Sequence, residues 1–293
     1  MVTRRDATAL IGALGLGTAA VPQWSTAVKA DTQTLPGNSV EQNESWVRIL
    51  GRTDEGESVW QGSSRIFALT KDGVTPLLTI RGAGRSWWQR EGDDTYRRYP
   101  SSINFFTDPE SGEFIDSFEN PLTGRTVSLE PTIQRRQDGE VFTPNGSYFP
   151  ITRERFPEMY NEDPLSLDWR LDAGTIRVFD TQHFAPLARQ PIYEVHTYFA
   201  PADEALDESR NSAQAASSGW FTGSFSRWLD MADVDGYMIW HFEGTKLNGL
   251  VDLDSAYLAR AREMSENFDI SPEFDKGPSY IDTVEKKRSE EKK

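Results

Sequence analysis

The chain of 293 residues has 46 acidic and 31 basic residues, a formal net charge of −15 and no cysteine. Recognition of phosphate depends on clustered Lys and Arg, so this balance argues against nucleic acid and anionic membrane surfaces as partners. The absence of cysteine excludes disulfides, thiolate metal sites and a cysteine nucleophile. The length is sufficient for one large domain or two small ones, held together by core burial.

Residues 1–30 have the pattern of an export signal. Arg4 and Arg5 precede a weakly apolar run at 9–21, which is too short and too rich in Gly and Ala to anchor the chain in a bilayer. The pattern resembles a twin-arginine signal cleaved after Ala30, so we expect a periplasmic or secreted protein with no stable membrane anchor after processing. The alternative is a cytosolic protein with an amphipathic first helix.

The next segment, 31–45, is polar and contains a Pro-Gly step, which predicts a linker. Beyond it the chain consists of short runs in which apolar and polar residues alternate. The runs at 58–70 and 74–80 flank an Asp72-Gly73 step, and this combination predicts a β-hairpin.

Three further runs lie at 103–107, 113–119 and 125–133, separated by the turn sequences DPESG and NPLTG. Each turn has Asp or Asn first, then Pro, whose φ is already fixed, and ends in Gly, which accepts a positive φ. The pattern predicts an antiparallel meander of three strands.

Additional strands are predicted at 175–180, 192–199 and 237–243. The segment at 200–219 is polar and rich in Ala and Ser, which is typical of a mobile surface loop or a lid. Residues 254–268 repeat apolar side chains at helical spacing after two capping candidates, Asp254 and Ser255.

These elements predict a mainly β fold. One antiparallel β domain spans 46–250, and 251–293 form a C-terminal helix and a charged tail. An antiparallel sheet of this length hides its edges by curling, so a barrel or half-open barrel is the expected architecture.

Two blocks of sequence carry a family resemblance. The first has the pattern N-P-x-T-G-x-x-V and runs from Asn120 to Val127. The second lies within 225–247 and matches at Trp228, Leu229, Met231, Asp233, Gly236, Gly244, Lys246 and Leu247. From about Trp46 to the C-terminal helix, the chain resembles the family catalogued as domain of unknown function 1838. The resemblance implies export and one fold unit, and it implies no particular activity.

The first candidate site lies in the strand predicted at 192–199. Glu194, His196 and Tyr198 share one face of that strand, because residues two apart point the same way. If this face lines a cavity, His196 can act as general base, Glu194 can orient it, and Tyr198 can donate a proton to an oxyanion. The alternative is the solvated outer face of the sheet. Pro191 before the strand and the predicted loop after it favour the interior.

His241 is a second catalytic candidate, and a structural role for it is the alternative. Together with His183 and His196 it makes up all the histidines of the chain. Their spacing lacks the short-range pairs that are typical of metal ligands, so neither a metal nor another cofactor is expected.

Arg227, Trp228 and Asp233 follow the predicted loop and are candidates to close over a ligand, with Arg227 binding a carboxylate. The alternative is a loop held rigid by its own ion pairs and an aromatic plug. Trp87 and Trp240 complete the ligand-binding candidates, although aromatic side chains fill cores as readily as they line small-molecule sites.

Two functions are compatible with these patterns. The leading prediction is a protein that binds a small hydrophobic molecule and performs acid-base chemistry of isomerase, cyclase or hydrolase type without a cofactor. The alternative is a non-catalytic periplasmic ligand-binding or scaffold protein. The patterns predict neither the identity of the ligand nor the oligomeric state.

Overall fold

The structure is a computed structural model that describes residues 34–155, 157, 165–184, 192–265, 268, 269, 271 and 272. The expected export signal at 1–30 and the charged end of the tail lie outside the described residues.

Antiparallel strands make up most of the described chain. They are β1 (Gly56–Thr70), β2 (Gly73–Arg90), β3 (Tyr96–Thr107), β4 (Ser117–Glu119), β5 (Thr126–Ser128), β6 (Thr132–Arg135), β7 (Glu140–Thr143), β8 (Gly146–Tyr148), β9 (Asp168–Asp172), β10 (Thr175–Phe184), β11 (Ile192–Pro201), β12 (Ala216–Gly223) and β13 (Tyr237–Leu247). The helical elements are α2 (Ser39–Leu50), α3 (Pro150–Arg155), α4 (Ala202–Ala205), η2 (Arg227–Leu229), η3 (Leu250–Asp252) and α5 (Ser255–Met264).

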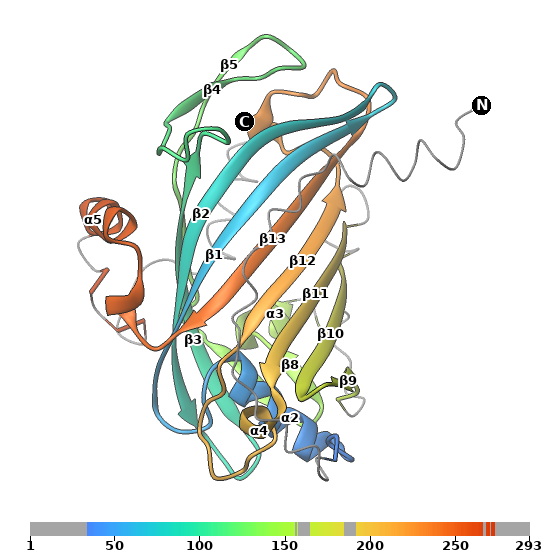
Figure 1. The fold of residues 1–293 in the computed structure, drawn as a ribbon, viewed down its shortest axis with the longest axis vertical. Helices are drawn as coiled ribbons and strands as arrows, with labels where there is room; N and C mark the ends of the chain where they lie inside the picture. Colours follow the sequence, from blue (N-terminus) through green and yellow to red (C-terminus); the bar gives the residue numbers. More distant parts are fainter. Residues whose placement is uncertain are drawn as a thin grey trace.

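The main sheet has 11 strands in the order β8-β7-β3-β2-β1-β13-β12-β11-β10-β9, with β6 also paired to β3. The pairing of β1 with β13 joins the two ends of the chain at the centre of the sheet. Within the described ranges the outermost strands, β8 and β9, do not pair with each other, so the expected barrel is not confirmed. Figure 1 shows the result, a long twisted sheet that is open along one side. The mainly β fold and the C-terminal helix are confirmed.

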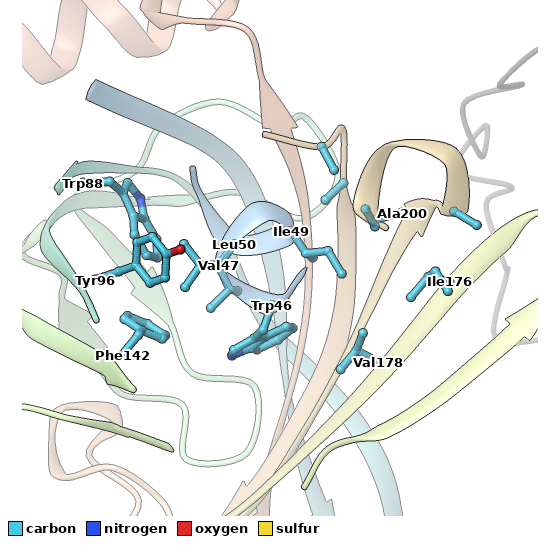
Figure 2. Close-up of a cluster of buried hydrophobic side chains, with 14 residues drawn as sticks. Trp46, Val47, Ile49, Leu50, Trp88, Tyr96, Phe142, Ile176, Val178 and Ala200 are labelled. Carbon is cyan, nitrogen blue, oxygen red and sulfur yellow. The ribbon is translucent and has the colours of Figure 1, made fainter. Parts of the chain in front are cut away.

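The two faces of this sheet are covered by different elements, and we name them the α2 face and the α5 face. At the lower end of the sheet in Figure 1, α2 packs on one face. Figure 2 shows four residues of α2, namely Trp46, Val47, Ile49 and Leu50, packed among side chains of the sheet. Trp88, Tyr96 and Phe142 come from one half of the strand order, and Ile176, Val178 and Ala200 come from the other half. The helix therefore bridges the two halves of the sheet.

A linker was predicted at 31–45, but α2 already begins at Ser39, so the prediction is wrong from that residue onward. Asn38 caps it, because its Oδ1 accepts hydrogen bonds from the backbone N–H groups of Val40 and Glu41, each at 3.0 Å. Glu41 adds a further contact at this end by accepting a bond from the N–H of Gly37, the residue before the cap, at 2.7 Å.

A buried lysine fixes the other end of α2. Lys246 of β13 donates from Nζ to the carbonyl oxygens of Arg48 at 2.9 Å, Ile49 at 3.3 Å and Gly51 at 2.5 Å. These carbonyls end the helix and have no partner within it, so the lysine satisfies them. Burial, aided by the charge of Arg52, nevertheless lowers the pKa of Lys246 to about 7.

The helix α5 covers the opposite face, the α5 face, and confirms the helix predicted after Asp254. The Oδ1 of Asp254 accepts a hydrogen bond from the N–H of Tyr257 at 2.9 Å and caps the helix. The Tyr257 hydroxyl donates to the carbonyl of Ile103 at 2.8 Å and accepts from the N–H of Ala83 at 3.1 Å. One phenol thus joins α5 to two neighbouring strands.

The meander predicted at 103–133 is confirmed in part, since its first strand belongs to β3. The second and third predicted strands contain β4 and β5, which pair antiparallel as expected but form a separate two-stranded sheet. This hairpin packs over the upper end of the α2 face, where Val127 and Leu129 join a buried cluster with Leu229 and Met231. The hairpin predicted around Asp72-Gly73 is confirmed as β1 and β2.

The surface loop predicted at 200–219 is shorter than expected and covers only 206–215. β11 continues to Pro201, α4 follows, and β12 begins at Ala216. Ala202, Ala205, Ala213 and Ala215 are all buried in the cluster around α2. The small side chains that suggested a loop instead allow close packing against the helix.

Candidate functional site

Glu194, His196 and Tyr198 of β11 form a connected polar chain, which we call the β11 triad. His196 Nε2 lies 2.5 Å from Glu194 Oε1, and the Tyr198 hydroxyl oxygen lies 3.4 Å from His196 Nδ1. With the Nε2 proton donated to the carboxylate, neutral His196 presents Nδ1 as an acceptor for the phenol. The side chains of His196 and Glu194 are 20% and 23% exposed. The triad is thus ordered by its own contacts and still reaches solvent.

The triad lies on the α2 face of the sheet. Tyr198 packs edge-on against Trp46 of α2, with ring centroids 4.7 Å apart, and against Trp60 of β1, at 6.1 Å. Desolvation by these neighbours, together with the negative charge of Asp180, raises the pKa of Tyr198. Its phenol therefore stays protonated at neutral pH and remains a proton donor.

The same face contains a hollow of about 190 Å³, which we call the glycine hollow. Its base is formed by Gly62 of β1, Gly82 and Gly84 of β2, and Gly244 of β13. Gly244, Gly62 and Gly82 stand directly opposite one another on three adjacent strands. Side chains on one face would fill this space, so the run of glycines is what creates it.

Aromatic side chains bound the glycine hollow on two sides. Trp60 is fixed by α2, since its indole Nε1 donates to the carbonyl of Leu50 at 2.8 Å. Phe242 lies over Gly219, where an added Cβ would be 2.5 Å from the ring. Ile80 also lines the hollow. The surroundings combine an apolar rim with a base of exposed backbone.

The β11 triad borders this hollow through two of its lining residues and is not part of the lining itself. The ring of His196 lies 4.5 Å from that of Phe242. Tyr198 stands opposite Ser217 on β12, and Ser217 in turn stands opposite Gly244. A molecule in the hollow would therefore be next to a hydrogen-bonded chain of phenol, imidazole and carboxylate.

The other histidines do not join this site. His241 lies on the opposite, α5 face of β13, where its Nε2 is 3.4 Å from Ser218 Oγ. The side chain of His183 lies outside the described part of the chain. No cluster of His, Asp and Glu able to hold a metal ion occurs among the described residues. The structure thus separates the two predicted catalytic histidines, His196 and His241.

The predicted ligand clamp at 227–233 is instead joined to the β4–β5 hairpin. Asp233 and Asp230 both pair with Arg125, at 2.7 Å and 2.9 Å. Trp228 packs on Phe106 with ring centroids 5.2 Å apart. These contacts match the alternative of a segment held rigid by ion pairs. The side chain of Arg227 lies outside the described residues.

Trp240 and Trp87, the remaining candidates, lie on different faces. Trp240 is on the α2 face and packs on Phe221 at 5.1 Å, in the cluster under the β4–β5 hairpin. Trp87 alternates with the buried Trp88 and so points to the α5 face, away from the triad. Neither lines the glycine hollow.

Sequence reasoning missed the residues that shape the hollow. The glycines of the RGAGR stretch resemble a phosphate-binding loop, although they lie within β2. Glycine inside a strand often marks a close approach of another group, and that signal is present at Gly62, Gly82, Gly84 and Gly244. Asn104 and Ser217 carried no signal of their own, because isolated polar residues are common in strands.

A known protein family matches most of the chain. The family model described as "Protein of unknown function (DUF1838)" matches residues 55–289. No curated protein and no solved structure matches the chain.

None of the helices in the described part of the chain is both long enough and apolar enough to span a membrane.

Proposed function

We propose that this chain, which belongs to the DUF1838 family, binds a small hydrophobic molecule on the α2 face and moves a proton on it with the β11 triad. The observation that carries the proposal is the continuous path from the Tyr198 hydroxyl through His196 to Glu194, beside the glycine hollow. A hydrogen-bonded acid, base and orienting group next to a cavity is the usual arrangement for general acid-base chemistry.

The proposed step is a proton relay. The phenol oxygen of Tyr198 takes a proton from the ligand while the phenol proton passes to Nδ1 of His196. The imidazolium that forms is stabilised by the carboxylate of Glu194. The electron pair of the broken bond stays on the ligand as an enolate or similar anion, and reversal of the relay returns the proton at another atom. The net reaction is an isomerisation.

Proton abstraction can be tested before the natural substrate is known. A panel of small carbonyl compounds with acidic α-hydrogens is incubated with the mature protein in D2O, and replacement of hydrogen by deuterium is followed by NMR. We expect protein-dependent exchange in at least one compound. Because general acid-base groups contribute about 10²–10⁴-fold, His196→Gln and Tyr198→Phe should each slow the exchange at least about 100-fold.

The matched control is His241→Gln, which removes an imidazole from the other face of the sheet and should leave the exchange unchanged. Thermal unfolding of every variant separates lost chemistry from lost folding. Exchange that survives both triad substitutions, or its absence across the panel, would contradict the proposed chemistry. Ligand binding without exchange would favour the non-catalytic alternative.

We also propose that the protein is exported by the folded-protein route and is periplasmic or secreted. The support is Arg4-Arg5 ahead of a weakly apolar run. Replacing both arginines with lysine should leave the uncleaved precursor in the cytoplasm, and cell fractionation with immunoblotting measures this. Normal export and processing of the double variant would contradict the twin-arginine route.

A further inference from the structure

Two neutral polar side chains lean over the glycine hollow from opposite sides. Asn104 of β3 stands opposite Gly82, and a Cβ added to Gly82 would be 2.0 Å from Asn104 Oδ1. Ser217 of β12 stands opposite Gly244, and a Cβ there would be 2.8 Å from Ser217 Oγ. The glycines are therefore what allows both polar atoms to lie above the backbone.

Both atoms are available to a ligand. Asn104 uses its Nδ2 to bond Thr132 Oγ1 at 3.2 Å, which leaves Oδ1 as an acceptor facing the hollow. Neither Asn104 Oδ1 nor Ser217 Oγ has a hydrogen-bond partner within the part of the chain that the structure describes. A ligand that reaches both needs a hydrogen-bond donor at the Asn104 end and a polar group at the Ser217 end.

The distance between the two ends sets the length of the ligand. Gly82 and Gly244 are separated by one strand, β1, and adjacent strands lie about 4.8 Å apart, so the span is about 10 Å. The volume of about 190 Å³ is below the roughly 300 Å³ at which pockets for drug-sized molecules begin. The ligand is therefore small, with its polar groups at opposite ends.

The lining carries no charge on the α2 face. Glu243 is the one acidic residue among the residues that line the hollow, and its exposed side chain lies on the α5 face. A charged ligand would lose its hydration there without gaining a counter-ion. At Gly84 an added Cβ meets nothing within 4 Å, and the rim includes the rings of Trp60 and Phe242. A flat base beside aromatic rings suits a flat molecule.

We infer that the glycine hollow takes an uncharged planar ring system about 10 Å long, with a hydroxyl or N–H group at the Asn104 end and an oxygen function at the Ser217 end. This inference rests on the proposed function and specifies its substrate class. The Ser217 end lies beside Tyr198, so the oxygen function there is the one next to the proton that is moved.

Three synthetic probes test charge and planarity separately. They are a naphthalene diol with hydroxyls at its two ends, the corresponding naphthalene dicarboxylate, and the saturated decalin diol. Titration calorimetry with the full mature chain should show binding of the naphthalene diol. The dicarboxylate and the decalin diol should each bind at least about tenfold more weakly. Equal affinity for the three probes, or no binding of the naphthalene diol, would overturn the inference.

A substitution that fills the hollow locates the binding. Gly84→Val adds a side chain where there is open space, and valine is favoured in strands, so folding should be retained. It should weaken binding of the naphthalene diol at least about tenfold. Thr245→Val is the matched control, because Thr245 is exposed on the α5 face of β13, is not among the residues that line the hollow and should not affect binding. Asn104→Ala and Ser217→Ala should each weaken it about fivefold. Unchanged binding of the naphthalene diol by Gly84→Val would show that the diol does not bind in the glycine hollow.

One further variant distinguishes this inference from the proposed function. His196→Gln should bind the naphthalene diol like the wild type, because His196 does not line the hollow. If the diol binds but wild-type protein exchanges no ligand proton, the substrate class stands and the proton relay is wrong. If the wild type exchanges protons only on charged or saturated compounds, the relay stands and the substrate class is wrong.

Discussion

Asn120 of the β4–β5 hairpin donates from Nδ2 to the carbonyl oxygen of Leu229, 2.9 Å away, although the two residues are 109 positions apart. Asn120 is fully buried, and its Oδ1 also accepts a bond from the N–H of Leu122 at 3.0 Å. One amide thus joins the NPLTG turn to the segment at 227–233, the two blocks that carry the family resemblance.

Asn120→Ala should lower the free energy of unfolding by about 1–3 kcal/mol, because it leaves the buried carbonyl of Leu229 without its donor and the N–H of Leu122 without its acceptor. Urea denaturation measures the change. Arg125→Ala is the matched comparison, since Arg125 joins the same two segments through exposed ion pairs. Exposed pairs contribute little, so its effect should be much smaller. A larger loss in Arg125→Ala would contradict this ranking.

Lys246→Met should destabilise the protein by about 2 kcal/mol, because the carbonyls of Arg48, Ile49 and Gly51 each lose a buried donor and only those of Arg48 and Gly51 keep another. Methionine has a similar length and keeps the packing. Lys71→Met, at an exposed turn position, is the control and should be close to neutral. Chemical denaturation of both variants decides the comparison, and equal stabilities would show that the lysine does not hold the helix.

The same lysine predicts a dependence of stability on pH. Its pKa is about 7 in the folded protein, below the ordinary value of 10.5. Between these two values the unfolded chain binds a proton that the folded protein lacks, so the free energy of unfolding should rise with pH. The rise should be smaller in Lys246→Met. Parallel stability curves for the two proteins from about pH 7 to 9.5 would contradict the assignment.

Tyr257→Phe should lower the free energy of unfolding by about 1–3 kcal/mol, because the N–H of Ala83 and the carbonyl of Ile103 each lose a partner. Burial raises the pKa of this phenol to about 12. The folded state therefore holds the proton more tightly than the unfolded chain, and this contribution disappears as pH rises from about 10 to 12. The difference in the free energy of unfolding between Tyr257→Phe and the wild type should therefore be smaller above about pH 12 than at neutral pH, and urea denaturation at the two pH values measures it.

Two glycines on the α2 face should respond oppositely to alanine. At Gly219 a Cβ would be 2.3 Å from the carbonyl oxygen of Val195 and 2.5 Å from the Phe242 ring, so the backbone must shift. Gly219→Ala should destabilise by about 2 kcal/mol or more. At Gly84 a Cβ meets nothing, and alanine should be neutral or stabilising by up to about 1 kcal/mol. Comparing the melting temperatures of the two variants tests the difference.

That Glu194, His196 and Tyr198 share one face of β11 could be predicted from sequence, because alternation in a strand fixes which residues point the same way. The hairpin at Asp72-Gly73 and the start of α5 were likewise predictable, since turns and caps depend on a few neighbouring residues. The helix α2 was also signalled, by Asn38 followed by Glu41, although its polar first turn resembled a linker.

No local sequence feature indicates that β1 pairs with β13. Long-range pairing depends on how the whole set of strands fits together, and alternation says nothing about partners. The glycine hollow could not be foreseen for the same reason. Gly62, Gly82 and Gly244 become one surface only after three strands from distant parts of the sequence are aligned.

The central position of β1 next to β13 also constrains the order of folding. β1 can pair with β2 as soon as that hairpin has been synthesised, while its other edge waits for a strand near the end of the chain. Until then, β1 and β12 each expose an unpaired edge that can recruit strands of other molecules. Contacts between such distant residues slow folding. The pairing of β1 with β13 that completes the sheet is therefore also where a partly folded chain is most prone to aggregate.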